Sequence, residues 1–213
     1  FSRIAFCQMT PSYWKQATKE LAQNDAVLRD LIRCFKQEKI ASRGCAFTTL
    51  ARSIVGQQIS VKAAESVWQK VMDNMTGFSP ATILASQDEL LRSCGLSRQK
   101  VAYIRDLARY FTNTPQPERA WAVFTDQALI MELTQIKGIG RWTAEMFLIF
   151  HMQRPDVLPL DDIGLQRAIS RYYNDNQPID KKKMKEIALP WRPWRSVATW
   201  YLWRALDPLP VEY

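Results

Sequence analysis

Few residues in this chain of 213 amino acids could support metal or nucleophile chemistry. His151 is the only histidine, and no two of the four cysteines (Cys7, Cys34, Cys45 and Cys94) form a C-x-x-C pair. This set cannot complete a zinc site, and we interpret the cysteines as buried, reduced thiols. Chemistry is therefore expected from carboxylates, aromatic rings and backbone groups.

Suitable backbone groups lie in residues 133–150 (LTQIKGIGRWTAEMFLIF), where two glycines separate two predicted helices. Gly138 and Gly140 permit positive φ and the close approach of another backbone. The amides from Ile139 to Thr143 would then point out of a helix N-terminus, where unpaired N–H groups and the helix dipole suit a phosphate. The alternative is a plain helical hairpin whose glycines only cap a helix. The I-x-G-I-G-R-x-T-A context favours phosphate binding.

This segment resembles the helix-hairpin-helix of the HhH-GPD DNA glycosylase superfamily, in which a Gly/Pro-rich loop and a catalytic aspartate follow the hairpin. The loop corresponds to residues 154–160 (RPDVLPL), and Asp162 lies 22 residues after Gly140, where the family has its aspartate. The resemblance therefore implies that Asp162 is catalytic, with Asp161 as the alternative. Both aspartates would also suit a helix N-cap, and capping is compatible with catalysis.

In such enzymes, a carboxylate near C1′ stabilises the positive charge that builds on the sugar as the base departs. The nucleotide must first be flipped out of the duplex. Members that also cut the backbone carry a lysine two residues after the second hairpin glycine, where this chain has Trp142. Members with an iron–sulfur cluster carry cysteines after the aspartate, where this chain has none. The resemblance implies a monofunctional glycosylase without an iron–sulfur cluster.

The resemblance also assigns a pocket for the flipped base. Trp142, Met146 and Trp203 occupy the pocket positions, where an aromatic ring could stack on an electron-poor base through cation–π attraction. Met146 stands where a relative has an aromatic residue, which changes the expected shape of the pocket. For the aromatic residues of the C-terminal helix in general, packing in the core is the default expectation.

A second segment, GQQIS at residues 56–60, resembles the G-Q-x-[IVL]-S turn whose tip fills the gap left by a flipped nucleotide. Gln58 is the wedge by position, and Gln57 precedes it. The alternative is a helix end at Gly56 followed by an N-cap at Ser60. Lys100 either reaches phosphate or lies at a solvated helix start.

The expected contacts with DNA and with a cation follow from these two segments. The predicted DNA-binding residues are Gln57, Gln58, Lys137, Gly138, Ile139, Gly140, Arg141 and Thr143. The relatives also imply a structural Na⁺ or K⁺ ion on the backbone carbonyls of Thr134, Ile136 and Ile139. No other cofactor is expected.

Helical periodicity dominates the sequence, and no alternating strand pattern exceeds four residues. Helices are predicted at 11–22, 26–35, 46–55, 61–72, 87–94, 101–111, 126–136, 143–152, 164–173 and 193–206, with N-caps at Asp25, Ser60 and Asp126. We expect an all-α, two-lobed HhH-GPD fold with the active-site cleft between the lobes. One glycosylase unit would span 1–213, with lobe A at about 45–115 and lobe B at 1–44 plus 116–213.

A formal net charge of +8 favours a polyanionic partner, and no apolar run approaches the length of a membrane span. The nearest branch is the bacterial 3-methyladenine DNA glycosylase II type, without the β-rich N-terminal domain of its larger members. We expect a soluble, monomeric, cytoplasmic (nucleoid-associated) enzyme that excises 3-methyladenine and 7-methylguanine from duplex DNA in base excision repair. The alternatives are a glycosylase for deaminated, oxidised or mismatched bases and a non-catalytic DNA-binding module.

Overall fold

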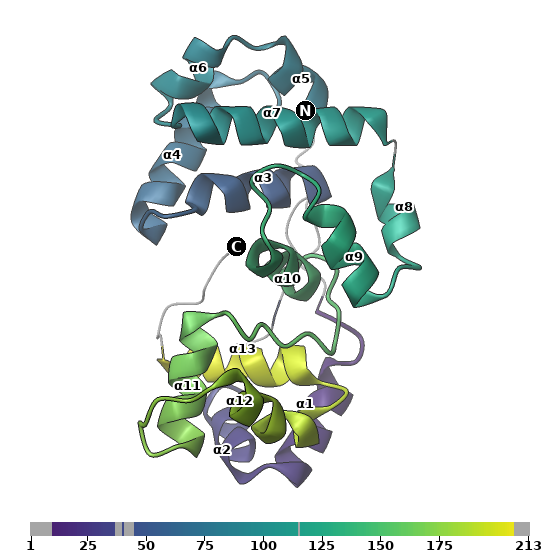
Figure 1. The fold of residues 1–213 in the computed structure, drawn as a ribbon, viewed down its shortest axis with the longest axis vertical. Helices are drawn as coiled ribbons and strands as arrows, with labels where there is room; N and C mark the ends of the chain where they lie inside the picture. Colours follow the sequence, from purple (N-terminus) through teal and green to yellow (C-terminus); the bar gives the residue numbers. More distant parts are fainter. Residues whose placement is uncertain (1–9, 37–39, 41–44, 115, 207–213) are drawn as a thin grey trace. The chain divides into compact units, whose positions relative to one another are not determined.

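The computed structural model describes residues 10–36, 40, 45–114 and 116–206. Every regular element in that part of the chain is a helix, which confirms the predicted all-α class (Figure 1). The elements are α1 (Trp14–Asn24), α2 (Ala26–Cys34), α3 (Ala46–Gly56), α4 (Val61–Asn74), α5 (Pro80–Ala85), α6 (Asp88–Ser93), α7 (Arg98–Asn113), α8 (Pro117–Trp121), α9 (Asp126–Leu133), α10 (Arg141–Phe150), α11 (Ile163–Tyr173), α12 (Lys181–Ile187), the 3-10 turn η1 (Leu189–Trp191) and α13 (Arg195–Leu206).

The chain forms two compact units. The terminal unit comprises Phe1–Arg43 and Leu148–Glu212, and the central unit comprises Gly44–Phe147. Within the central unit, α7 packs against α3, α5 and α6, and α3 also contacts α4 (Figure 1). Within the terminal unit, α13 contacts α1, α2 and α11.

This division differs from the predicted lobes, because residues 116–147 belong to the central unit and not with the N-terminal helices. Trp121 of α8 supplies the physical reason. Its ring, 1% exposed, stacks on Tyr110 of α7 with 6.3 Å between the centroids. It also contacts Phe111 and Phe147 edge to face at 5.8 and 5.6 Å. This buried aromatic cluster fastens α8 and the first part of α10 to α7.

Helix α13 forms the core of the terminal unit. Every residue from Ser196 to Trp203 is buried, as expected for a helix that other helices cover on several sides. Trp14 of α1 meets Trp200 edge to face at 5.3 Å and Tyr201 at 5.8 Å. The expectation of core packing is confirmed for Trp200 and Tyr201.

The Asp25 carboxylate connects several elements of the terminal unit through hydrogen bonds. It caps α2 by accepting a 2.9 Å hydrogen bond from the Leu28 amide, which confirms the predicted N-cap. It also accepts hydrogen bonds from the Tyr173 hydroxyl at 3.0 Å and from the Trp191 indole at 2.9 Å. Because Tyr173 is the last residue of α11, this carboxylate ties α11 to the start of α2.

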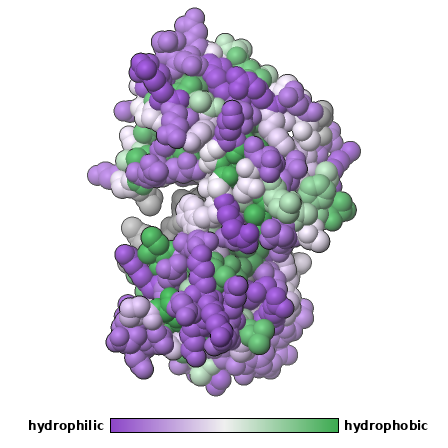
Figure 2. All heavy atoms as spheres, in the orientation of Figure 1, coloured by the Kyte–Doolittle hydropathy of each residue, from purple (hydrophilic) through white to green (hydrophobic). Residues whose placement is uncertain are grey.

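The surface in Figure 2 is mostly hydrophilic. Within the described residues, no helix is long and apolar enough to cross a membrane. Cys94 is buried, as predicted, but the free thiols of Cys34 and Cys45 are exposed, so the prediction of buried packing is wrong for these two. Cys7 lies outside the described residues.

Candidate active site and nucleic-acid interface

Asp162 is a buried carboxylate at the start of α11. Its side chain is the N-cap of the helix, and Oδ1 accepts a 2.6 Å hydrogen bond from the Leu165 amide. The same oxygen accepts a 2.7 Å hydrogen bond from Nε1 of Trp203. Only 7% of the residue is exposed. Two donors on one oxygen fix the orientation of the carboxylate.

Asp161, the alternative, has a different environment. It is exposed, and its carboxylate forms an ion pair with Lys181, which is also half exposed. An exposed pair of this kind holds a side chain only weakly. Of the two neighbouring aspartates, the structure therefore fixes Asp162 alone.

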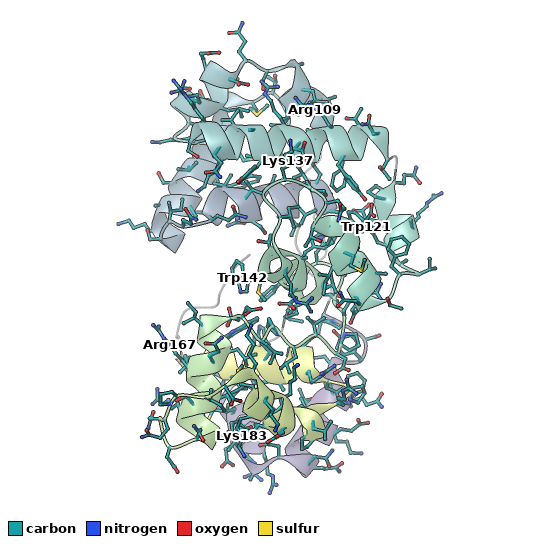
Figure 3. All side chains as sticks on the ribbon, in the orientation of Figure 1. Arg109, Trp121, Lys137, Trp142, Arg167 and Lys183 are labelled. Atoms are coloured by element: carbon teal, nitrogen blue, oxygen red, sulfur yellow. The ribbon has the colours of Figure 1, made fainter. Side chains whose placement is uncertain are left out.

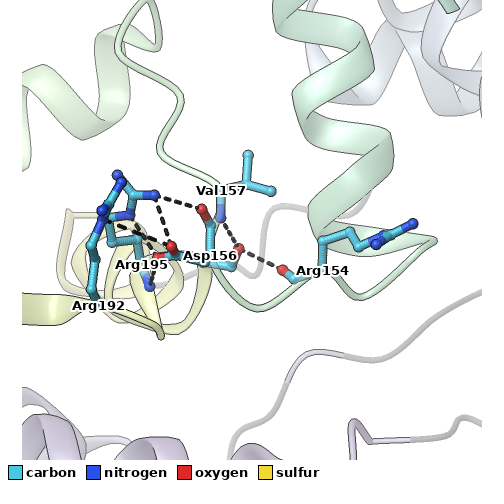
Figure 4. Close-up of polar contacts among 6 residues, drawn as sticks. Arg154, Asp156, Val157, Arg192 and Arg195 are labelled. Carbon is cyan, nitrogen blue, oxygen red and sulfur yellow. Dashed lines mark hydrogen bonds and ion pairs between the residues drawn. The ribbon is translucent and has the colours of Figure 1, made fainter. Parts of the chain in front are cut away.

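The loop that leads to Asp162 is fastened to the start of α13 (Figure 4). The guanidinium of Arg195 donates to both carboxylate oxygens of Asp156, with Nε to Oδ1 at 2.6 Å and Nη2 to Oδ2 at 2.8 Å. The Ser196 hydroxyl accepts a hydrogen bond from the Val157 amide at 2.9 Å and donates to the Arg154 carbonyl at 2.6 Å. Paired hydrogen bonds between charged groups are geometrically specific. Helix α13 therefore holds the loop through its first turn and Asp162 through Trp203.

Trp203 occupies a position that sequence reasoning assigned to the wall of a base pocket. Its ring is 7% exposed and stacks on Phe150 with 5.8 Å between the centroids and 13° between the planes. The indole edge faces Asp162, and Gly164 lies beside both groups. The contact between Trp203 and Asp162 joins residues 41 positions apart, which no local pattern could reveal.

The hairpin between α9 and α10 uses its two glycines differently. Gly138 has a φ of +87°, and a Cβ there would lie 2.3 Å from the Tyr103 ring of α7. Only glycine satisfies both conditions, so Gly138 lets the hairpin pack closely on α7. Gly140 does not have a positive φ, and a Cβ there would meet open space. Its carbonyl accepts a 3.0 Å hydrogen bond from the Ala144 amide and thus begins α10.

Some of the residues predicted to bind phosphate are buried or form hydrogen bonds within the hairpin itself. The Ile139 amide donates to the Ile136 carbonyl at 3.0 Å, so it is not presented to a ligand as predicted. Ile139 and Thr143 are each 4% exposed, and their side chains are therefore not offered to DNA. The exposed Gly140 and Arg141 lie at the N-terminus of α10, where amides suit an anion.

Two carboxylates hold the charged residues of the hairpin. The Lys137 amide donates to Oδ2 of Asp106 in α7 at 3.0 Å, and Figure 3 shows Lys137 beside this helix. Nε of Arg141 donates to Oε1 of Glu145 at 2.9 Å. The Arg141 side chain is 53% exposed, whereas that of Glu145 is 4% exposed. The buried carboxylate of Glu145 thus fixes Nε of the exposed Arg141 side chain at the hairpin. Neither Asp106 nor Glu145 was predicted from the sequence.

The turn after α3 separates the roles of the two glutamines. Gln57 Nε2 donates to the Gly138 carbonyl at 2.7 Å, which ties the turn to the hairpin. Gln58 is exposed and has a φ of +60°, as expected for a residue at the tip of a turn. Ser60 caps α4 by accepting a hydrogen bond from the Ala63 amide, as predicted. A helix end and an N-cap therefore frame an exposed tip.

Lys100 supports this turn from within the central unit. Its ammonium donates to the carbonyl oxygens of Val55 and Gln57 at 2.7 and 2.8 Å, so it neither extends into solvent nor faces outward toward phosphate. Burial lowers the pKa of Lys100 below its usual value. Lys100 satisfies carbonyls at the end of α3 that the helix itself leaves open.

The residues predicted to line a base pocket belong to different units. Trp142 and Met146 belong to the central unit, and Asp162 and Trp203 to the terminal unit. Trp142 is half-buried in the first turn of α10 (Figure 3), and Met146 is 1% exposed. The predicted cation on the carbonyls of Thr134, Ile136 and Ile139 stays a prediction. Among the described residues, no cluster of histidine, cysteine, aspartate and glutamate could hold a metal ion.

Comparison with known proteins identifies a family model and several relatives that are similar to this chain. The family model described as HhH-GPD superfamily base excision DNA repair protein matches residues 51–193. DNA-3-methyladenine glycosylase 1 of Schizosaccharomyces pombe is 32% identical over 192 residues, covering 86% of this chain and 82% of the relative. The crystal structure of a Bacillus halodurans DNA-3-methyladenine glycosidase has a TM-score of 0.81 and 32% identity, covering 96% of this chain and 95% of that one.

A further solved structure was determined with DNA. The Schizosaccharomyces pombe 3-methyladenine DNA glycosylase in complex with abasic DNA has a TM-score of 0.74 and 28% identity, covering 89% of this chain and 95% of that one. The family model spans two thirds of the chain, including the hairpin, the loop after it and Asp162. This chain therefore belongs to the HhH-GPD superfamily of base excision DNA repair proteins.

Proposed function

We propose that this chain is a monofunctional DNA glycosylase that excises 3-methyladenine and 7-methylguanine from duplex DNA. The observation that carries the proposal is the carboxylate of Asp162, which is 7% exposed and fixed by two hydrogen bonds to one oxygen. The resemblance of the sequence motif to the family implies a catalytic aspartate at this position. The names of the relatives support alkylated bases as the substrate class.

A fixed carboxylate suits the hydrolysis of an N-glycosidic bond. The bond between C1′ and the base nitrogen breaks, the base leaves with the electron pair, and positive charge develops on the sugar. Asp162 stabilises that charge, water adds its oxygen to C1′, and the water's proton passes to the carboxylate or to solvent. A cationic alkylated purine leaves as a neutral base, so one carboxylate is sufficient.

Trp142 supports both the monofunctional outcome and the choice of base. It occupies the hairpin position at which bifunctional relatives carry an amine, so no Schiff base with the sugar forms there. The product is an abasic site in an intact strand. An indole face also attracts a cationic base through cation–π interaction, whereas an unmodified purine carries no charge.

The central unit supplies the proposed contacts with DNA. The start of α10 and Arg141 would hold a backbone phosphate, and the exposed Gln58 would fill the gap left by the flipped nucleotide. Binding through phosphates weakens as salt rises. We further propose that the protein acts as a monomer in the cytoplasm, with water as its only co-reactant.

The test is base release from methylated duplex DNA by wild type, Asp162→Asn and Asp161→Asn. Asparagine still caps a helix, so Asp162→Asn removes the charge with little change to α11. Asp161→Asn is the matched control, because it makes the same substitution one residue away on an exposed side chain. We expect Asp162→Asn to lose at least about a hundredfold in rate and the control to stay close to wild type. Strand scission should appear only after alkali.

Other outcomes identify the alternatives. Equal release by wild type and Asp162→Asn would refute the catalytic assignment. Release only from duplexes that contain uracil, 8-oxoguanine or a mismatch would replace alkylated purines with another class of lesion. Salt-sensitive binding to duplex DNA with no release from any of these substrates would indicate a binding module.

A further inference from the structure

Gly164 lies where the Trp203 indole meets Asp162. It is the second residue of α11, and a Cβ at this position would lie 3.1 Å from Oδ1 of Asp162. The same Cβ would lie 3.2 Å from Cδ1 and 3.3 Å from Nε1 of Trp203. Oδ1 of Asp162 is the acceptor and Nε1 of Trp203 the donor of one hydrogen bond, 2.7 Å long. A methyl group at residue 164 would therefore crowd both ends of that hydrogen bond.

Neither group has much freedom to move away. Oδ1 of Asp162 also accepts the capping hydrogen bond from Leu165, so a shift of the carboxylate would strain the start of α11. The Trp203 ring is 7% exposed and stacked on Phe150, so a shift of the indole would disturb a packed core. Added atoms would have to displace one partner by a few tenths of an ångström.

The backbone of residue 164 gives no other reason for a glycine. It lies within a helix and does not have the positive φ seen at Gly138. Helix propensity alone favours alanine over glycine at such a position. Helix propensity thus predicts that Gly164→Ala is favourable, whereas the lack of space for a methyl group beside Asp162 and Trp203 predicts that it is unfavourable.

We infer that Gly164 and Trp203 are positioning residues for the carboxylate of Asp162. The missing side chain at residue 164 gives the indole room to donate to Oδ1, and this donation fixes the direction in which the carboxylate faces the sugar. The inference rests on the proposed function for its effect on rate, and on the hydrogen bond itself for its geometry. Trp203 therefore acts through Asp162, beyond its expected place in a pocket wall.

A double-mutant cycle with Gly164→Ala, Trp203→Phe and the double variant tests the inference. Phenylalanine retains an aromatic ring next to Phe150 but has no N–H. Base release under single-turnover conditions should fall about tenfold in each single variant, because small displacements of a catalytic group are costly. The double variant should be no slower than Trp203→Phe, because the contact that Gly164 protects is already absent.

Two controls separate positioning from folding and binding. Urea unfolding should show that Gly164→Ala still folds cooperatively, because the helix propensity of alanine offsets part of the strain that its methyl group puts on the hydrogen bond. Affinity for duplex DNA with an abasic site should be unchanged, because the inference concerns the carboxylate and not the contacts with DNA. If Gly164 instead leaves room for the nucleotide, affinity would fall and the two substitutions would be additive, which would overturn the inference.

A measurement without turnover distinguishes this inference from the proposed function. The Trp203 indole N–H proton, assigned by its disappearance in Trp203→Phe, should resonate downfield in the wild type and move upfield in Gly164→Ala. An unmoved resonance would overturn the inference, as would a release rate within about twofold of wild type. A wild type that releases no alkylated base would refute the proposed function, while the resonance would still decide whether Gly164 positions the hydrogen bond.

Discussion

The Gln57 side chain donates a 2.7 Å hydrogen bond to the carbonyl oxygen of Gly138, which joins the turn after α3 to the hairpin before α10. Lys100 holds the same turn from α7 through the carbonyls of Val55 and Gln57. The two segments proposed to contact DNA are thereby fixed to each other within the central unit. Neither can move alone without losing a partly buried hydrogen bond.

Replacing Gln57 by alanine should loosen this connection. We expect the free energy of unfolding to fall by about 1 kcal/mol, because one neutral hydrogen bond is lost. Base release from a lesion-containing duplex should slow several-fold, since the turn is no longer held against the hairpin. Urea unfolding and single-turnover release measure the two effects. Gln69→Ala on α4, which removes an exposed hydrogen bond to Asp73, is the control and should change neither.

Gln58→Gly should make the protein more stable and less active. Glutamine at a φ of +60° is strained, and glycine should relieve about 0.5–1 kcal/mol. The same change removes the side chain proposed to fill the gap in the duplex. Release should therefore slow for a lesion in a normal base pair, and less for a lesion opposite a mismatched base, whose flipping costs less. Equal rates for wild type and variant on both duplexes would show that Gln58 is not the wedge.

Local signals predicted much of the fold. Asp25 and Ser60 were recognisable as N-caps because a cap acts within three residues. Thr125, and not Asp126, caps α9; both are competent caps, and the sequence did not separate two neighbours. The short helices α5 and α8 were missed, because six and five residues are too few to show a helical period. The capping box of Ser79 and Thr82, with proline between them, was the available signal for α5.

Only the parts of the candidate site that lie within one stretch of sequence were predictable. The hairpin glycines and the position of Asp162 follow from one stretch of sequence. The Trp203 donor, the space at Gly164 and the pairing of Arg195 with Asp156 depend on how α13 packs against α11 and the loop before it. The assignment of residues 116–147 to the wrong lobe has the same origin, because the packing of Trp121 on α7 is tertiary.

Arg195→Lys should slow the chemistry without weakening binding. Lysine keeps the charge beside Asp156 but cannot form the two parallel hydrogen bonds, so the loop before Asp162 is held less firmly. We expect a loss of about 1–2 kcal/mol of stability and a several-fold slower release, with unchanged affinity for DNA containing an abasic site. Arg192→Lys is the control: its Nε lies 3.9 Å from Asp156 Oδ2 and its side chain is 59% exposed, so little should change. A loss of affinity in Arg195→Lys would point to a phosphate contact instead.

Alkaline pH should destabilise the fold through three half-buried tyrosines, Tyr13, Tyr110 and Tyr173. Burial, assisted by a hydrogen bond to Glu132, raises the pKa of Tyr110 to about 12, from 10.0 in an unfolded chain. Burial also raises the pKa values of Tyr13 and Tyr173. Between pH 10 and 12 the unfolded tyrosine loses its proton while the folded one keeps it, so the free energy of unfolding falls as the pH rises.

Tyr110→Phe isolates one of these contributions. Below pH 10 the wild type should be more stable than the variant, because its hydroxyl donates to Glu132. Above pH 10 the difference should shrink as the unfolded tyrosine ionises. Because the pKa of Lys100 is lowered from 10.5, this lysine makes the free energy of unfolding rise with pH below pH 10.5. This contribution is common to both proteins and cancels in the comparison. Urea unfolding at pH 8 and pH 11 measures the change; a difference that stays constant would show that Tyr110 ionises equally easily in the folded and unfolded states.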